Sequence, residues 1–304
     1  MNLLRSLPGY TLNILLQDGT FITAGGNGLK RVSANGDTIW NFSGRYHHRI
    51  AEADENHFLA ITDVVAPLRS QRIRFDVIEK RKIKDGSVVS RFSFLDKSDI
   101  IGNIASSNPA LVAFSSMSDR DVTSSFADRE YSHVNSVREI PAKFRKNFGN
   151  GNFLVNDPAR GVCFALSENL DRVTWTLQSL KLVLRGNYTH DCSVTDNGIV
   201  LLFYNEAGSV DKKTIRASFL RFLPDGSFIG RFPKLGEYTP LVTQGGGVRE
   251  FGDGFILVAS DESTAEIIFT DKHGKVINKK RLPYVVQDLE LGDFSKFLKL
   301  SHVF

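Results

Sequence analysis

Short runs of β-branched and aromatic residues, each broken by a glycine-containing turn, recur along the whole chain. Asp18-Gly19 separates residues 11–17 from 20–24, and Asn35-Gly36 separates residues 29–33 from 38–42. Asn-Gly and Asp-Gly between such runs are the strongest short-range signal for a β-hairpin. The first forty residues therefore predict four antiparallel strands in an up-and-down meander.

The same pattern returns in four further units. The strands expected after the first one in each unit cover 58–63, 73–78 and 88–92; 153–155, 161–166 and 172–177; 199–204, 218–222 and 227–232; and 255–259, 265–270 and 276–280. Four-stranded units repeating about every 40–55 residues predict an all-β protein of the β-propeller type. Residues 285–291 and 296–303 predict two strands of a sixth unit. We expect one domain spanning residues 1–304, preferably a six-bladed β-propeller with an incomplete last blade, and alternatively a five-bladed one. A long loop is expected at about residues 95–132.

Composition narrows the function only slightly. The net charge of +4 is too small to indicate a nucleic-acid partner, and the longest uncharged stretch is too polar for a membrane span. The start of the chain lacks a signal-peptide pattern, which favours a cytoplasmic location. Cys163 and Cys192 lie 29 positions apart, a spacing that predicts neither a disulfide framework nor a zinc ribbon. No cofactor is expected, and the sequence does not indicate an oligomeric state.

Three of the seven histidines fall at equivalent places in their units. His190 precedes Gly198 by eight residues and His48 precedes Asn56 by eight, while His133 opens the third unit ahead of a longer insertion. The first strand of a propeller blade is the innermost one and lines the central channel. We therefore expect these three histidines to begin the first strands of their blades and to converge at one mouth of that channel. Such a cluster predicts a pocket for an anionic ligand. Two other interpretations are a structural role between blades and a metal site, the latter disfavoured because only Asp191 supplies a nearby carboxylate.

The segments around these histidines resemble the arylsulfate sulfotransferase family, whose members are six-bladed propellers. The resemblance lies in a His-His opening, a His-x-Asn-Ser motif, a hairpin ending in Trp-x-Leu, a His-Asp strand and a glycine-rich strand. These segments are Tyr46–Thr62, Ser132–Ile140, Gly151–Leu177, Thr189–Asn205 and Gly245–Ser260. Together they extend the resemblance over residues 11 to 290.

The resemblance implies an enzyme that moves a sulfuryl group from an aryl sulfate ester to a phenolic or hydroxyl acceptor through a covalent histidine intermediate. It implies that His190 is the nucleophile and that His48 and His133 bind the sulfate oxygens. The further substrate-binding residues expected are Asn135, His47, Arg160, Asn156 and Asp191. Asp157 stands where the family has an arginine. That departure favours the alternative, a catalytically silent propeller that binds an anionic ligand.

Overall fold

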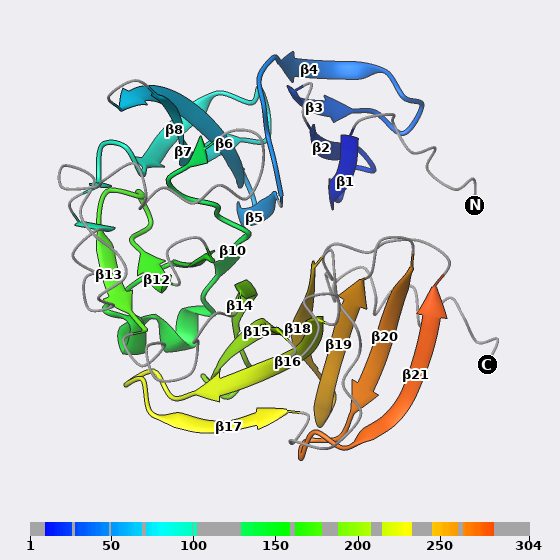
Figure 1. Ribbon diagram of the computed structural model, residues 1–304. Coiled ribbons are helices and arrows are strands. Elements are labelled where there is room, and N and C mark those ends of the chain that lie inside the picture. The colour runs from blue at the N-terminus through cyan, green and yellow to red at the C-terminus, as the bar shows by residue number, and fades with distance from the viewer. Residues whose placement is uncertain are drawn as a thin grey trace. The chain divides into compact units, whose positions relative to one another are not determined.

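The computed structural model describes 11 segments of the chain, which fall into two compact units, Met1–Lys181 and Leu182–Phe304. The described segments are 10–25, 28–48, 50–68, 71–98, 100–101, 129–158, 162–177, 188–207, 215–232, 245–260 and 264–282. Nearly all their regular structure is antiparallel β-sheet (Figure 1).

The first unit contains three four-stranded meanders, each with its strands hydrogen-bonded in chain order. They are β1 (Tyr10–Leu15), β2 (Phe21–Gly25), β3 (Gly28–Val32) and β4 (Thr38–Phe42); β5 (Ala51–Asp54), β6 (His57–Leu68), β7 (Gln71–Lys82) and β8 (Val88–Ser93); and β10 (Ser136–Glu139), β11 (Phe153–Asp157), β12 (Val162–Leu166) and β13 (Val173–Thr176). A short strand, β9 (Arg129–Glu130), pairs in parallel with β7, and a 3₁₀-helix, η2 (Ala142–Phe148), occupies the insertion between β10 and β11.

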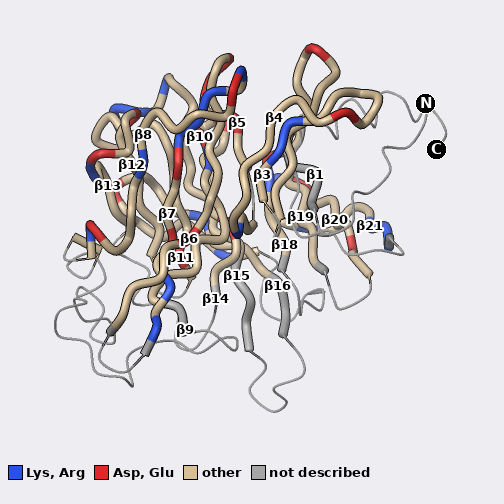
Figure 2. The backbone as a smooth tube through the Cα atoms, turned by 90° about the horizontal axis from the view of Figure 1, so that it is seen from above, with Lys and Arg blue, Asp and Glu red and all other residues tan. Residues whose placement is uncertain are grey.

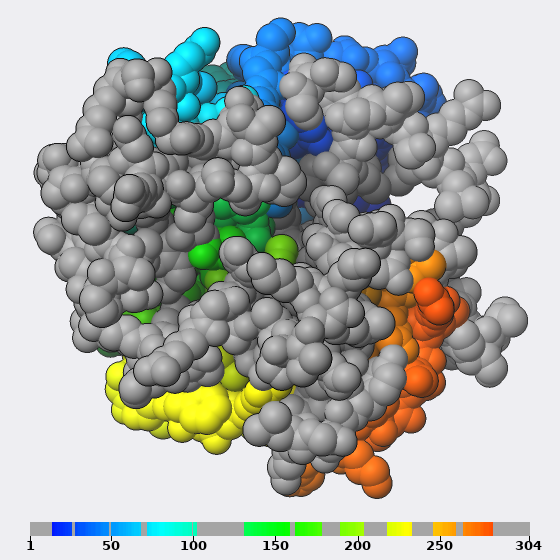
Figure 3. All heavy atoms as spheres, in the orientation of Figure 1, coloured from blue at the N-terminus to red at the C-terminus, as the bar shows by residue number. Residues whose placement is uncertain are grey.

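The second unit contains two more meanders of the same kind. They are β14 (Tyr188–Val194), β15 (Val200–Ala207), β16 (Ile215–Phe222) and β17 (Phe228–Phe232), and β18 (Gly245–Phe251), β19 (Gly254–Ser260), β20 (Ala265–Thr270) and β21 (Val276–Leu282). The outer strands β17 and β21, yellow and orange-red in Figure 3, reach the surface, and they carry the exposed apolar side chains of Phe228 and Ile277. Turns at Asp225-Gly226 and His273-Gly274 follow the third strands of these two meanders.

Neighbouring meanders within a unit meet along their first strands. In the first unit β5 packs beside both β1 and β10, and in the second unit β14 packs beside β18. Apolar side chains fill the space between the sheets: Phe92 lies 5.9 Å from Phe164 in the first unit, and Phe219 lies 5.0 Å from Phe255 in the second, centroid to centroid. Each sheet thus buries its faces against its neighbour, which a single four-stranded meander cannot do alone. The sheets are therefore blades of a β-propeller.

The described part of the chain contains five blades, which is the arrangement of the five-bladed alternative, and the preferred six-bladed arrangement is not supported. The two strands expected for a sixth blade, residues 285–291 and 296–303, lie outside the described residues, as does most of the expected loop at 95–132. A local strand pattern does not establish a blade, because a blade also needs partners across its ladders.

The structure bears on two further expectations, those about disulfides and about membrane-spanning segments. Cys163 on β12 and Cys192 on β14 are both disulfide-bonded, which corrects the expectation of no disulfide. Their separation along the chain could not reveal this, because spacing does not determine which cysteines meet in space. Among the described residues no helix is long and apolar enough to cross a membrane. Lysine and arginine are interspersed with acidic residues along the described strands (Figure 2).

Candidate functional site

The segment between β4 and β5 carries the His-His pair and is fixed to β6. Tyr46 forms an isolated bridge with Thr62, and the backbone N–H of His47 donates to the carbonyl oxygen of Ile61 over 3.1 Å. The Thr62 hydroxyl donates to the carbonyl oxygen of Arg45 over 2.7 Å. These bonds hold the segment in an extended path along β6. The two histidines are therefore placed by the backbone as well as by their own side chains.

Tyr46 also fixes this segment to the core. Its ring is buried, and its phenolic oxygen accepts a hydrogen bond of 2.8 Å from Nη2 of Arg81. Burial raises the pKa of Tyr46, and the positive charge of Arg81 opposes that rise only in part. Next along the chain, His48 adopts a φ of +52°, a backbone conformation that side chains other than glycine rarely take. Observed strain of this kind is concentrated at binding and catalytic sites.

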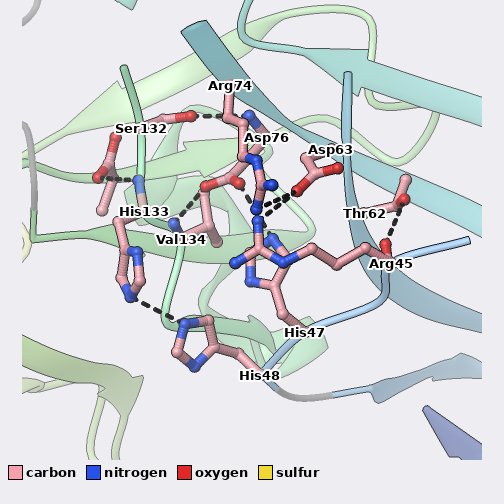
Figure 4. A network of polar contacts seen from close by, with 11 residues as sticks. Arg45, His47, His48, Thr62, Asp63, Arg74, Asp76, Ser132, His133 and Val134 are labelled. Carbon is pink, nitrogen blue, oxygen red and sulfur yellow. Dashed lines mark hydrogen bonds and ion pairs between the residues drawn. The ribbon is translucent and has the colours of Figure 1, made fainter. Parts of the chain in front are cut away.

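The imidazoles of His48 and His133 are in direct contact. Their Nε2 atoms lie 3.0 Å apart, and their ring centroids are 4.7 Å apart with an interplanar angle of 73°. The ring of His47 lies 5.0 Å from that of His48 and 6.3 Å from that of His133. Figure 4 shows the His48 and His133 rings meeting from separate segments of the chain. At the 3.0 Å contact one ring nitrogen donates and the other accepts.

Asp76 on β7 connects this histidine cluster to the sheet. Its carboxylate is buried, with Oδ1 3.0 Å from Nε2 of His47 and Oδ2 accepting the backbone N–H of Val134 over 2.5 Å. The backbone N–H of Asp76 donates to the Ser132 hydroxyl over 2.8 Å. A buried carboxylate is tolerated only when it is paired and hydrogen-bonded. Asp76 therefore contacts His47 and both neighbours of His133, since its carboxylate holds the Val134 backbone and its own backbone N–H holds the Ser132 side chain.

A second carboxylate, Asp63 on β6, gathers two arginines beside the histidines. Nη1 of Arg45 and Nη1 of Arg74 both contact the same oxygen, Oδ2 of Asp63, the second over 3.8 Å. Asp63 and Asp76 are directly paired across β6 and β7, so their side chains project from the same face of the sheet. The arginine pair therefore lies on the face of β6 and β7 that also carries Asp76, the partner of His47, and Figure 4 shows both guanidinium groups at Asp63.

The predicted binding residues of the third blade are deeply buried next to His133. Asn135 and Asn156 are both buried, and the backbone N–H of Asn135 donates to the carbonyl oxygen of Asn156 over 3.0 Å. Asp157 is fully buried, and its Oδ1 accepts the backbone N–H of His133 over 3.0 Å. The Asp157 carboxylate thus positions His133. Arg160 lies outside the described residues.

His190 belongs to the second unit, so its expected convergence with His48 and His133 stays a prediction. It occupies an irregularity in the ladder, because Thr189 and Asp191 pair with the consecutive residues Tyr204 and Phe203 and leave His190 as the extra residue. Bulges of this kind re-aim a side chain and are frequent next to active sites. The ring of His190 lies 6.4 Å from that of Phe203.

Asp191 is buried and forms an ion pair with Arg249 on β18. The carboxylate therefore has a structural partner within its own unit. The common register expected for the histidines is only approximate. His48 and His133 each lie three residues before their first strand, whereas His190 is the third residue of its strand. Equal spacing to the following turn does not place His48 and His190 alike because β5 has four residues and β14 has seven. The insertion expected after His133 contains the 3₁₀-helix η2.

Sequence reasoning did not find several residues of this site. Arg45, Asp63, Arg74, Asp76 and Ser132 all belong to its polar network. The signal for Asp76 was present, since an acidic residue between the apolar residues of a predicted strand occupies a buried position that needs a partner. Among the described residues no group of three or more His, Cys, Asp or Glu is arranged to hold a metal ion.

The fold and the site thus define a β-propeller protein with a histidine cluster next to an arginine pair. No protein-family model matches the chain, and no curated protein matches it. Among solved structures, the chain is similar to BamB from Moraxella catarrhalis, with 11% identity, a TM-score of 0.46 and coverage of 92% of this chain and 78% of the other. It is also similar to the allergen Mala s 1 of Malassezia sympodialis, with 10% identity, a TM-score of 0.49 and coverage of 91% and 83%.

Proposed function

We propose that this chain is a sulfotransferase-like enzyme that transfers the sulfuryl group of an aryl sulfate ester to a phenolic or hydroxyl acceptor. The observation that carries the proposal is the contact between His48 and His133, with His47 beside them and Asp76 orienting it. Neutral imidazoles act as nucleophiles and as N–H donors near neutral pH. The sequence resemblance to arylsulfate sulfotransferases assigns the nucleophile to His190.

In this proposal His48 and His133 hold the oxygens of the sulfuryl group. Their Nε2 atoms share one hydrogen bond in the structure, so only one of the two nitrogens donates to the other. An anionic oxygen placed between them accepts an N–H from each ring and separates the rings. Donors aimed at oxygens that gain charge stabilise the transition state. Asn135, buried next to His133, is the expected further donor.

The chemical step is a double displacement. The lone pair of a His190 ring nitrogen attacks sulfur, a sulfur–nitrogen bond forms, and the bond from sulfur to the aryl oxygen breaks with its electron pair leaving on the phenolate. The oxygen of the acceptor then attacks sulfur, and the sulfur–nitrogen electron pair returns to His190. The proton of the acceptor passes to solvent. No redox change occurs, and the sulfuryl group moves intact.

The test is release of nitrophenol from p-nitrophenyl sulfate in the presence of phenol. We expect turnover by the wild type, none by His190→Ala, and a decrease in kcat/KM of about 100- to 1,000-fold for His133→Ala. His273→Ala is the matched control, because His273 lies exposed on a hairpin turn of the same unit as His190. Equal release by wild type and His190→Ala contradicts the nucleophile assignment.

A binding protein without turnover is the second candidate function. Asp157 favours it, because this buried carboxylate stands where the resembling family has an arginine and here it accepts the His133 backbone N–H. In that case the wild type binds inorganic sulfate or phosphate in calorimetry and releases no nitrophenol above the blank.

The cytoplasmic location also stays a prediction. The disulfide-bonded Cys163 and Cys192 argue against it, since disulfides persist mainly in oxidising compartments.

A further inference from the structure

We infer that Arg45 and Arg74 form the cationic part of a subsite that binds the tetrahedral oxyanion of the ligand, either a sulfate or a phosphate group. The inference rests on the proposed function for its ligand class, but it requires binding alone and no turnover. Two guanidinium groups meet at one oxygen of Asp63, so this group of three side chains carries one positive charge in excess.

A subsite for an anion requires the cationic groups to be more exposed than the carboxylate, and these three side chains follow that order. Asp63 retains 11% of its side-chain surface, whereas Arg45 retains 34% and Arg74 24%. The carboxylate is therefore covered by the arginines, and the cations are the groups that face solvent. Guanidinium forks match the geometry of sulfate and phosphate oxygens, which makes arginine the preferred residue for binding them.

Each of the other two carboxylates of the site accepts a backbone N–H within the protein. Asp76 has both oxygens engaged, one with His47 and one with the Val134 backbone N–H. Asp157 is fully buried against the backbone of His133. The exposed side of the network thus presents the guanidinium groups of Arg45 and Arg74, which donate hydrogen bonds to an anion.

The β-sheet register places this cationic pair beside the histidines. Asp63 is the direct cross-strand partner of Asp76, and directly paired side chains have Cβ atoms about 4.5–5.5 Å apart. Arg45 is also two residues from His47 on one extended segment. An oxyanion held by the arginines therefore lies within reach of the imidazoles. Arg45 and Arg74 bind and position the ligand in this account and take no part in the transfer of electrons or protons.

Asp63 keeps a cationic partner when either arginine is removed alone, so single variants are expected to fold. The experiment is isothermal calorimetry of the full chain with inorganic sulfate and with inorganic phosphate, in a chloride buffer. We expect Arg45→Gln and Arg74→Gln each to weaken binding about tenfold or more. Arg74→Lys, which retains the charge and loses the fork, is expected to fall between. The arm with the lower Kd identifies the preferred oxyanion.

Arg91→Gln is the matched control. Arg91 lies exposed on β8 opposite Glu79, and its substitution removes the same charge from the same unit. The subsite is contradicted if the wild type binds neither anion, if both arginine variants bind like the wild type, or if Arg91→Gln weakens binding equally. Turnover of p-nitrophenyl sulfate separates this test from that of the transferase. Anion binding that needs both arginines, in a protein without turnover, supports the subsite and rejects the transferase.

Discussion

Asp76 is the residue whose loss should disturb the first unit most among the polar residues of the site. Substitution by alanine removes the oxygen that lies 3.0 Å from His47 Nε2 and the oxygen that accepts the Val134 backbone N–H. The hydrogen bond from the Val134 backbone N–H to this charged carboxylate contributes about 1.5–3 kcal/mol, and its loss leaves a buried donor without its acceptor. We therefore expect Asp76→Ala to lower the free energy of unfolding of this unit by about 1.5–3 kcal/mol.

Tryptophan fluorescence is the suitable probe, because both tryptophans of the chain, Trp40 and Trp175, lie in the unit formed by residues 1–181. Urea unfolding followed by this signal gives the stability of that unit directly. In thermal unfolding the same loss corresponds to roughly 3–12 °C for a unit of this size. Asp76→Asn should be intermediate, because its amide oxygen still accepts the Val134 backbone N–H while the negative charge beside His47 is lost.

Asp96→Ala is the control, since Asp96 is an exposed carboxylate of the same unit. Its unfolding free energy should stay within about 0.5 kcal/mol of the wild type. An Asp76→Ala variant as stable as Asp96→Ala would refute the role given to the carboxylate. It would mean that His47 and the segment around His133 are held by other contacts.

Three further predictions concern other parts of the chain. Gly246→Ala places a methyl group 2.0 Å from a backbone carbonyl oxygen of the neighbouring strand and should lower the free energy of unfolding by about 1–3 kcal/mol or more. Gly230→Ala is the control, because the nearest atom to its new methyl group lies 3.7 Å away, and it should leave stability unchanged. Unfolding followed by circular dichroism compares the two variants. Burial raises the pKa of Tyr46 above its usual 10.0, so the unfolded chain ionises first and the free energy of unfolding falls as the pH rises above about 10. Tyr46→Phe should reduce that fall, and an unchanged pH profile would contradict it. The denatured, unreduced protein should show no reaction with a thiol reagent at Cys163 and Cys192, and both should react after reduction.

The strands could be predicted from the sequence because each is encoded locally. Alternation of apolar and polar residues together with Asp-Gly and Asn-Gly turns identified the meanders, and β4 (Thr38–Phe42) agrees with its prediction residue for residue. The described residues contain five blades and not the preferred six, and the strand pattern at residues 285–291 and 296–303 lies outside them. β6 and β7 are longer than predicted because they pair with each other through residues that break the local pattern, such as Pro67.

The candidate site could be predicted only in part. His47, His48 and His133 were found because their motifs are short and local, and the structure brings these three together. Asp63 and Arg74 were missed because their role depends on the register of β6 with β7, which no single segment reveals. The contact of Asp157 was also missed, since no motif reveals that its Oδ1 accepts the His133 backbone N–H.

The most direct test of the transferase is detection of the covalent intermediate. The wild type is mixed with p-nitrophenyl sulfate without an acceptor and analysed by intact-mass and peptide mass spectrometry. We expect a mass increase of one sulfuryl group on the peptide that contains His190, its absence in His190→Ala, and its loss when phenol is added. Rapid release of nitrophenol with no modified peptide, or modification of a different residue, would contradict it.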